Sequence, residues 1–195
     1  PLQLGHCSNE SIICRDEVCY LRVGRTYTNP IISDKSVPDP SVIRANDGYF
    51  YLYATQTKTY WMPVYRSKDL VNWEYQGTAF NKATEPDLPG GGAFWAPEIR
   101  FLNGKYVLYY SWAKMNGADI SYTAVAVGDT PMGPFLDSKE LIGNKEFGSN
   151  CIDQFYYEED GKKYMFFGSF KGIYVTELEL SLIHISEPTR LRCIS

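Results

Sequence analysis

Short runs of aromatic and aliphatic residues alternate with polar turns along most of the chain. Three of these runs, residues 49–55, 106–110 and 164–169, follow closely on a turn that contains glycine. Runs of this length that are rich in Tyr, Phe and β-branched residues are typical of β-strands. No amphipathic stretch with helical periodicity lies between them, so the pattern predicts an all-β protein.

The turns that precede these runs are similar and evenly spaced. Each pairs a small polar residue with a glycine, and Gly48, Gly104 and Gly161 follow one another at steps of 56 and 57 residues. Asp-Gly and Asn-Gly are strong signals of a β-hairpin, because both residues of its tight turn need positive φ. Self-similarity at a nearly constant step predicts a repeat architecture. The outer strands of the copies are expected at residues 64–66, 73–76, 122–127 and 172–178.

A repeat of roughly 56 residues that contains only strands fits one four-stranded blade of a β-propeller. The first strand of each blade lies beside the central channel, so equivalent side chains of successive blades face one funnel. A carboxylate precedes each turn glycine, Asp39 by nine residues, Glu98 by six and Asp153 by eight. We therefore expect these three carboxylates to converge on one concave site, an arrangement suited to acid–base chemistry.

Two residues near these carboxylates allow more than one interpretation. Pro40 follows Asp39 and prevents a helix there, which suits an extended functional carboxylate but also an Asx-type turn. Trp95 offers either a flat face for a sugar ring or an ordinary buried core side chain. Residues 85–92 end in three glycines and are expected to form a flexible access loop, because no Gly-Lys-Ser/Thr sequence follows.

Composition and charge narrow the possible partners. The 195 residues are 44% hydrophobic and 15% aromatic, which suits one domain with a sizeable core and a stacking site. The net charge is −4 without a basic stripe, so we expect no nucleic-acid partner. No run of 18 apolar residues occurs, so we expect no membrane span.

The histidines and cysteines argue against two further chemistries. The only histidines are His6 and His184, which leaves no base for a serine or cysteine triad. The cysteine spacing matches no common zinc pattern, so we expect no metal site. A disulfide within the first twenty residues stays open. The five cysteines are Cys7, Cys14, Cys19, Cys151 and Cys193.

The two ends of the chain differ from the repeats. Residues 1–25 form a poorly patterned arm that begins without a signal peptide, as a sequence with a missing beginning would. Residues 180–190, LSLIHISEPTR, resemble the translation of a transposase adapter used in preparing sequencing libraries. We therefore interpret residues 180–195 as a cloning or read-through artefact and residues 26–179 as a partial propeller with three blades. The natural protein is expected to continue beyond this point.

Several motifs, in the correct order, resemble glycoside hydrolase family 43 over about residues 27–178. This family consists of five-bladed β-propellers that act on arabinose- and xylose-containing plant polysaccharides. The resemblance implies an all-β, five-bladed β-propeller catalytic domain, of which this chain carries about three blades. The matching segments are NPIISDKSVPDPSVIR, YRSKDLVNWEYQG, FWAPEIRFLNGKYVLYYS, TPMGPF and IDQFYYEEDGKKYMFFGSFKGIYVTEL.

The resemblance also implies a role for each candidate residue. Asp39 is the expected general base, and Asp153 is the carboxylate expected to tune the pKa of the general acid and to orient it. Trp95 is expected to line the sugar subsite. Glu98 stands in the family's Trp-Ala-Pro-acid motif, where a structural role is expected rather than that of the acid. No cofactor is implied, although some relatives carry a structural calcium ion on the propeller axis.

Two features depart from the family pattern. Gln154 follows Asp153 where the family usually has proline. The family's general acid is a glutamate in the fourth blade, followed by a small residue and proline, and no such residue precedes the adapter-like segment. Glu187 with Pro188 lies inside that segment and is not assigned this role. We therefore expect the 195-residue chain to be inactive or nearly so.

The implied reaction is hydrolysis with inversion, in which a base activates water while an acid protonates the leaving oxygen. The segment GSFKGIYVTEL is more similar to arabinanases and arabinofuranosidases, which favours arabinan or arabinoxylan side chains as the substrate. Two alternatives stay open, a β-xylosidase of the same family and a non-catalytic carbohydrate-binding propeller. A polysaccharide substrate favours a secreted or periplasmic location.

Overall fold

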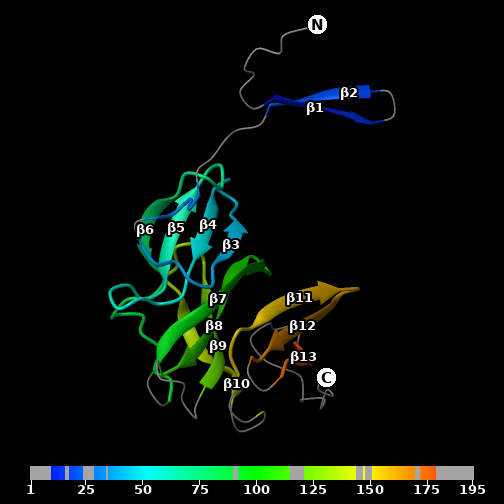
Figure 1. Ribbon diagram of the computed structural model, residues 1–195. Helices are drawn as coiled ribbons and strands as arrows, with labels where there is room; N and C mark the ends of the chain where they lie inside the picture. The colour runs from blue at the N-terminus through cyan, green and yellow to red at the C-terminus, as the bar shows by residue number, and fades with distance from the viewer. Residues whose placement is uncertain are drawn as a thin grey trace, which may run out of the picture. The chain divides into compact units, whose positions relative to one another are not determined.

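The chain divides into two compact units, Pro1–Ser33 and Asp34–Ser195. The first unit contains an antiparallel hairpin of β1 (Glu10–Arg15) and β2 (Val18–Val23), in a segment for which the sequence predicted no regular element. The computed structural model (Figure 1) describes residues 10–15, 18–23, 29–33, 35–89, 92–114, 121–143, 147, 151–169 and 172–178.

Some expectations concern residues outside these ranges. The adapter-like segment 180–195 lies outside the described residues, as do Cys7 and His6. Cys14 and Cys19 are paired in the register of the β1–β2 hairpin, and a disulfide between them stays a prediction. Cys151 is a buried free thiol.

Blade 1 is the first sheet of the second unit and contains four antiparallel strands in sequence order. These are β3 (Ser41–Arg44), β4 (Phe50–Tyr53), β5 (Pro63–Ser67) and β6 (Glu74–Thr78). Each strand pairs with the next one along the chain, which gives the simple meander that a propeller blade requires.

Blade 2 repeats this plan with longer strands. Its order is β7 (Ala93–Leu102), β8 (Lys105–Ala113), β9 (Ser121–Gly128) and β10 (Leu136–Gly143). β8 is buried along almost its entire length, because it is an inner strand of a sheet that is covered on both faces.

Blade 3 contains three antiparallel strands in the described part of the chain, β11 (Phe155–Glu159), β12 (Lys162–Phe167) and β13 (Tyr174–Glu177). Figure 1 colours the three blades from cyan through green to orange in chain order. The described residues of the second unit thus form antiparallel sheets, which confirms the predicted all-β class. None of them forms a helix with the length and hydrophobicity that crossing a membrane requires.

Two of the three hairpin turns have the predicted backbone conformation. Asn103 and Gly104 have φ values of 52° and 77°, and Asp160 and Gly161 have values of 52° and 75°. Positive φ at both positions is what a two-residue hairpin turn with right-handed strand twist requires.

The first turn differs from this prediction. Only Gly48 has positive φ there, at 84°, so the expectation that Asp47 shares this conformation was wrong. The loop is longer than the two-residue turns of the other copies, and within it the Gly48 N–H donates to the Ala45 carbonyl at 3.0 Å. The Asp47 carboxylate accepts a hydrogen bond from the Tyr49 N–H at 3.0 Å, the Asx-type contact by which aspartate stabilises a turn.

The face between blades 1 and 2 is filled by aromatic side chains. Phe80 stacks on Phe94 with ring centroids 4.4 Å apart, and Tyr110 meets Phe80 edge-on at 5.2 Å. Tyr53 and Phe135 complete the centre of this cluster, and all five side chains are essentially inaccessible to solvent. The burial of several aromatic rings in one layer provides most of the force that joins the two sheets.

A second cluster joins blades 2 and 3. Tyr109 of β8 stacks on Tyr156 of β11, and Val107, Met165 and Phe167 pack around them. These side chains bury the face of blade 2 that is opposite to blade 1, which explains why β8 is buried on both sides.

The other face of blade 3 is open. Phe155 and Tyr157 alternate with Tyr156 along β11 and are 50% and 40% exposed. Alternate residues of a strand point to opposite faces, so these two rings lie on the face directed away from blade 2.

Candidate active site

The two predicted catalytic aspartates occupy equivalent places in blades 1 and 3. Asp39 lies two residues ahead of β3, and Asp153 lies two residues ahead of β11. Both have positive φ, 51° and 57°, a conformation that costs energy for residues other than glycine. Both residues are exposed. The same local backbone therefore presents a carboxylate at the entry of each first strand.

The third member of this series is Ala96, not Glu98. Ala96 lies 57 residues from each aspartate and also has positive φ, 41°. Glu98 is therefore not their equivalent, and its convergence with them on one concave site stays a prediction. Matching the copies on a carboxylate misaligned the second one, because Ala96 precedes Gly104 by eight residues just as Asp153 precedes Gly161. In the structure, a register shift in β7 lies between Trp95 and Glu98.

A threonine connects Asp39 to blade 2. The Thr55 hydroxyl donates to Asp39 Oδ2 at 2.7 Å, and Thr55 Oγ1 accepts the Ala96 N–H at 2.7 Å. The Thr55 N–H donates to the Pro38 carbonyl at 3.0 Å. The first carboxylate is thus joined to the next blade through one side chain.

Asp153 is held differently. Its backbone N–H donates to Ser111 Oγ of blade 2 at 2.9 Å. The pKa of its carboxyl is raised, first by partial desolvation and then by the negative charge of Asp39, while a hydrogen bond from Ser169 acts in the opposite direction. The influence of Asp39 means that two carboxylates separated by 114 positions in the sequence lie close enough to interact electrostatically.

Trp95 precedes Ala96 in β7 and is partly buried. Its indole N–H is enclosed and has no hydrogen-bond partner among the described residues. A buried indole N–H usually finds an acceptor, so this one is unusual. Partial burial leaves part of the ring accessible, and its role in a sugar subsite stays a prediction.

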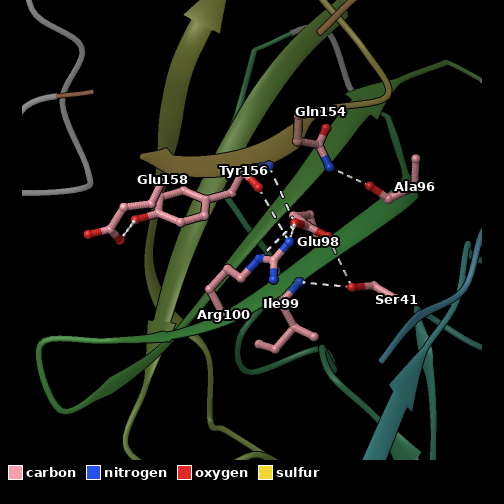
Figure 2. A network of polar contacts seen from close by, with 8 residues as sticks. All are labelled: Ser41, Ala96, Glu98, Ile99, Arg100, Gln154, Tyr156 and Glu158. Atoms are coloured by element: carbon pink, nitrogen blue, oxygen red, sulfur yellow. Dashed lines mark hydrogen bonds and ion pairs between the residues drawn. The ribbon is translucent and has the colours of Figure 1, made fainter. Parts of the chain in front are cut away.

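Glu98 is the centre of a polar network that joins the first strands of all three blades (Figure 2). Its Oε2 accepts a hydrogen bond from Ser41 Oγ at 3.2 Å, and its Oε1 accepts the Tyr156 N–H at 3.3 Å. Arg100 neutralises the carboxylate through an ion pair of 2.6 Å between Nη2 and Oε1. Glu98 is only 8% exposed, so these contacts favour the structural role that the family resemblance implies.

Gln154 bridges blades 3 and 2 with both ends of its amide. Its Nε2 donates to the Ala96 carbonyl, and its Oε1 accepts the Ser111 hydroxyl at 3.0 Å. The side chain is almost inaccessible to solvent. Where the family usually has proline, this protein therefore uses a buried amide to fix the segment that follows Asp153.

The sequence analysis missed Thr55 and Ser111. They lie 56 residues apart, and Gly168 follows 57 residues later at the third equivalent place. Aligning the copies on Asp39, Ala96 and Asp153 rather than on carboxylates would have revealed that a hydroxyl recurs at, or just beyond, the end of the second strand.

Metal ligands are a separate question. Within the described ranges, no group of three or more His, Cys, Asp or Glu side chains is arranged to hold a metal ion. The chemistry available from these residues is that of carboxylates, hydroxyls and an aromatic face, which suits general acid–base catalysis on a neutral polar substrate.

The second unit is a partial propeller that presents two carboxylates at equivalent strand entries. Residues 27–194 match the family model described as glycosyl hydrolases family 43, and the chain belongs to this family. The resemblance found in the sequence motifs is thereby confirmed. The matched range includes residues 180–194, so their interpretation as an artefact stays a prediction.

Relatives include arabinanases and β-xylosidases. The chain is 28% identical over 156 residues to extracellular endo-α-(1→5)-L-arabinanase 1 of Bacillus subtilis, covering 76% of this chain and 48% of the relative. It is 29% identical over 147 residues to the β-xylosidase of the same organism, covering 71% and 26%. The chain spans about half the length of the arabinanases that it matches, and about a quarter of the β-xylosidases.

Solved structures agree with the fold. The α-L-arabinanase of Cellvibrio cellulosa, complexed with arabinohexaose, aligns with a TM-score of 0.65 and 30% identity. The alignment covers 80% of this chain and 52% of that chain. The predicted propeller fold, with part of its blades in this chain, is confirmed.

Proposed function

We propose that this chain forms part of an inverting glycoside hydrolase that cleaves arabinose-containing plant polysaccharides, such as arabinan and arabinoxylan side chains. The observation that carries the proposal is the pair of Asp39 and Asp153, two carboxylates in equivalent backbone positions that interact electrostatically. Membership of family 43 and similarity to arabinanases support the choice of substrate.

Asp39 is the general base in this proposal. Thr55 engages its Oδ2, and Oδ1 is the oxygen that accepts a proton from the attacking water. In inverting enzymes the base and the acid stand roughly 6.5–9.5 Å apart, which leaves room for that water on the face opposite the leaving group.

Asp153 modulates the general acid. A nearby carboxylate raises the pKa of an acid by like-charge repulsion, which keeps the acid protonated until it donates to the leaving oxygen. The pKa of Asp153 is itself raised, first by desolvation and then by the negative charge of Asp39. The general acid is not assigned to any described residue, and inactivity of the 195-residue chain remains the expected outcome.

Trp95 provides the sugar-binding surface in this proposal. It directly precedes Ala96 in β7, and Ala96 belongs to the same positional series as the two aspartates. The axial C–H bonds of a sugar pack well on an aromatic face. Trp95→Ala is expected to weaken binding of arabinohexaose, measured by isothermal titration calorimetry, without changing the stereochemistry of the product.

The test is an assay on linear arabinan and on aryl arabinofuranosides and xylosides. It uses the 195-residue chain beside the longest product that its gene encodes. Arabinan turnover with inversion, followed by proton NMR of the anomeric signals, is the expected result for the longer product. Retention of configuration would refute the proposed mechanism. Turnover by the 195-residue chain would support the function but refute its expected inactivity.

Two other functions remain as alternatives. Faster cleavage of the aryl xyloside than of the arabinofuranoside would favour a β-xylosidase, which the similarity to β-xylosidases makes the second candidate. Binding of arabinohexaose by the longer product without any turnover would favour a carbohydrate-binding propeller.

A further inference from the structure

We propose that Thr55 is a positioning residue that fixes the Asp39 carboxylate and ties its orientation to blade 2. The inference rests on the proposed function only in that Asp39 is taken as the general base. The geometry itself concerns three described residues, Ala96, Thr55 and Asp39, which form a chain of two hydrogen bonds.

The direction of the Thr55 hydroxyl is determined by this chain. Ala96 donates its N–H to Thr55 Oγ1 at 2.7 Å, so the hydroxyl oxygen is already used as an acceptor. The single hydroxyl proton then points to Asp39 Oδ2, also at 2.7 Å. A donor and an acceptor contact on the same hydroxyl polarise each other and strengthen both bonds.

Thr55 is itself rigidly placed. Its N–H donates to the Pro38 carbonyl at 3.0 Å, next to Asp39 in the chain. The following residue, Gln56, donates its N–H to the Phe94 carbonyl at 2.8 Å and accepts the Phe94 N–H on Oε1 at 3.1 Å. Residues 55–56 are thus fastened to the start of β7, and threonine has restricted freedom about χ1.

As a consequence, the two carboxylate oxygens of Asp39 have different hydrogen bonding. Oδ2 is occupied by the hydroxyl, while Oδ1 has no hydrogen bond to any described residue. Oδ1 is therefore the oxygen left to accept a proton from water. A carboxylate held by one oxygen in an otherwise exposed position keeps a defined rotamer that solvent alone would not impose.

The equivalent hydroxyl in blade 2 is used for another purpose. Ser111 also accepts a backbone N–H from the next blade, that of Asp153, at 2.9 Å. Its proton, however, is donated to Gln154 Oε1 at 3.0 Å and not to a carboxylate. Blade 2 has Ala96 where blade 1 has Asp39, so the Ser111 hydroxyl has no carboxylate of its own blade to orient and turns to Gln154 instead.

The same chain of two hydrogen bonds links Asp39 to the proposed sugar surface. Ala96, the donor at its start, directly follows Trp95 in β7. A shift of this segment when a sugar packs on Trp95 would change the distance from the Ala96 N–H to Thr55 and, through it, the orientation of the base.

The experiment compares Thr55→Val, which keeps the shape and removes the hydroxyl, with Thr55→Ser, which keeps the hydroxyl. The first readout needs no catalysis and uses three-bond couplings from Asp39 Cγ to its backbone N and C′, which report the χ1 rotamer. Thr55→Val should give averaged couplings, and Thr55→Ser should restore the single-rotamer values. In any active form of the protein, kcat should fall about 10- to 100-fold with Thr55→Val while KM changes about twofold or less.

Thr78→Val is the matched control. Its hydroxyl donates to the Phe80 carbonyl at 2.7 Å in the same blade, so this substitution also removes one hydroxyl contact. Unchanged Asp39 couplings in Thr55→Val, or equal effects in Thr78→Val, would overturn the inference. Absence of turnover by the wild-type longer product would count against the proposed function, while the couplings still decide the role of Thr55. If Thr55→Val does not fold, Thr55→Ala takes its place in the same comparison.

Discussion

At the scale of single residues, the site depends on backbone conformations that most side chains avoid. Asp39, Ala96 and Asp153 all have positive φ, and each precedes or interrupts the first strand of its blade. Such strain persists only where surrounding contacts impose it, here the hydroxyls of Thr55 and Ser111 on the amides of the next blade. Two of these three strained positions, Asp39 and Asp153, present a carboxylate.

Asp39→Asn tests the proposed general base. The amide keeps the size of the side chain but does not accept a proton from water, so kcat on arabinan is expected to fall about 10²- to 10⁴-fold with little change in KM. Asp129→Asn is a suitable control, because Asp129 is an exposed carboxylate paired with Lys105. An Asp39→Asn variant with wild-type kcat would exclude this residue as the base.

Asp153→Asn is expected to change the pH dependence of stability. The folded-state pKa of Asp153 is raised, so the folded protein holds this proton more tightly than the unfolded chain does. The free energy of unfolding therefore decreases as pH rises from the unfolded-state value of about 3.9 through the raised pKa. Asp153→Asn removes this ionisation and should therefore raise Tm at pH 7. The expected rise is only about 1–3 °C, because solvent screens the charge of an exposed group.

The control for Asp153→Asn is the pH series itself. The difference in Tm from wild type should disappear at about pH 3, where the carboxyl is protonated in both the folded and the unfolded state. A difference that is the same at pH 3 and pH 7 would assign the effect to packing and not to charge.

At the scale of elements, the polar contacts that join the first strands of neighbouring blades, here called seams, repeat along with the sheets. Ser41 Oγ accepts the Ile99 N–H, and Glu98 Oε1 accepts the Tyr156 N–H, so equivalent side chains of blades 1 and 2 bind equivalent amides of the next blade. A serine suffices at the first seam. At the second, the longer glutamate needs Arg100 to compensate its buried charge.

Glu98→Ala is expected to lower the free energy of unfolding by about 3 kcal/mol, because it leaves the Arg100 charge and the Tyr156 amide without their partner. Glu98→Gln keeps the acceptor and should cost about 1 kcal/mol. Chemical denaturation measures both. Glu85→Ala removes a carboxylate from an exposed pair with Lys82 and is expected to change stability little. Equal effects of Glu98→Ala and Glu85→Ala would contradict the role of the seam.

The sequence predicted these elements well where local signals determine them. Asn103-Gly104 and Asp160-Gly161 adopt the expected turns, because a two-residue hairpin depends on the conformational freedom of its own residues. The alignment of Glu98 with the aspartates failed because the copies were matched on their carboxylates, whereas the residue at the equivalent distance from Gly104 is Ala96. Thr55 was missed for the same reason, because aligning the copies on Asp39, Ala96 and Asp153 is what places Thr55 opposite Ser111.

At the scale of the whole molecule, an apolar sheet face is unprotected. Phe155 and Tyr157 expose half or nearly half of their surface on the side of blade 3 directed away from blade 2. The faces of the described sheets that meet a neighbour bury most of their aromatic residues. An exposed apolar surface of this kind favours association.

The 195-residue chain is therefore expected to dimerise or to have low solubility, as measured by sedimentation velocity. Phe155→Thr combined with Tyr157→Lys should shift it toward monomer, because the exposed rings are replaced by polar groups. Leu136→Lys, a change at a residue of β10 that is 49% exposed, is the control for added charge. A monomeric wild-type chain with one cooperative unfolding transition would contradict this expectation.

Ala96 has a consequence for the shape of the proposed site. The equivalent residues of blades 1 and 3, Asp39 and Asp153, are acidic, so the series consists of two carboxylates with a methyl group at the middle position. Residue 96 therefore adds only a methyl group to the proposed site. A larger side chain there would take up space beside Trp95 without adding a group that transfers protons.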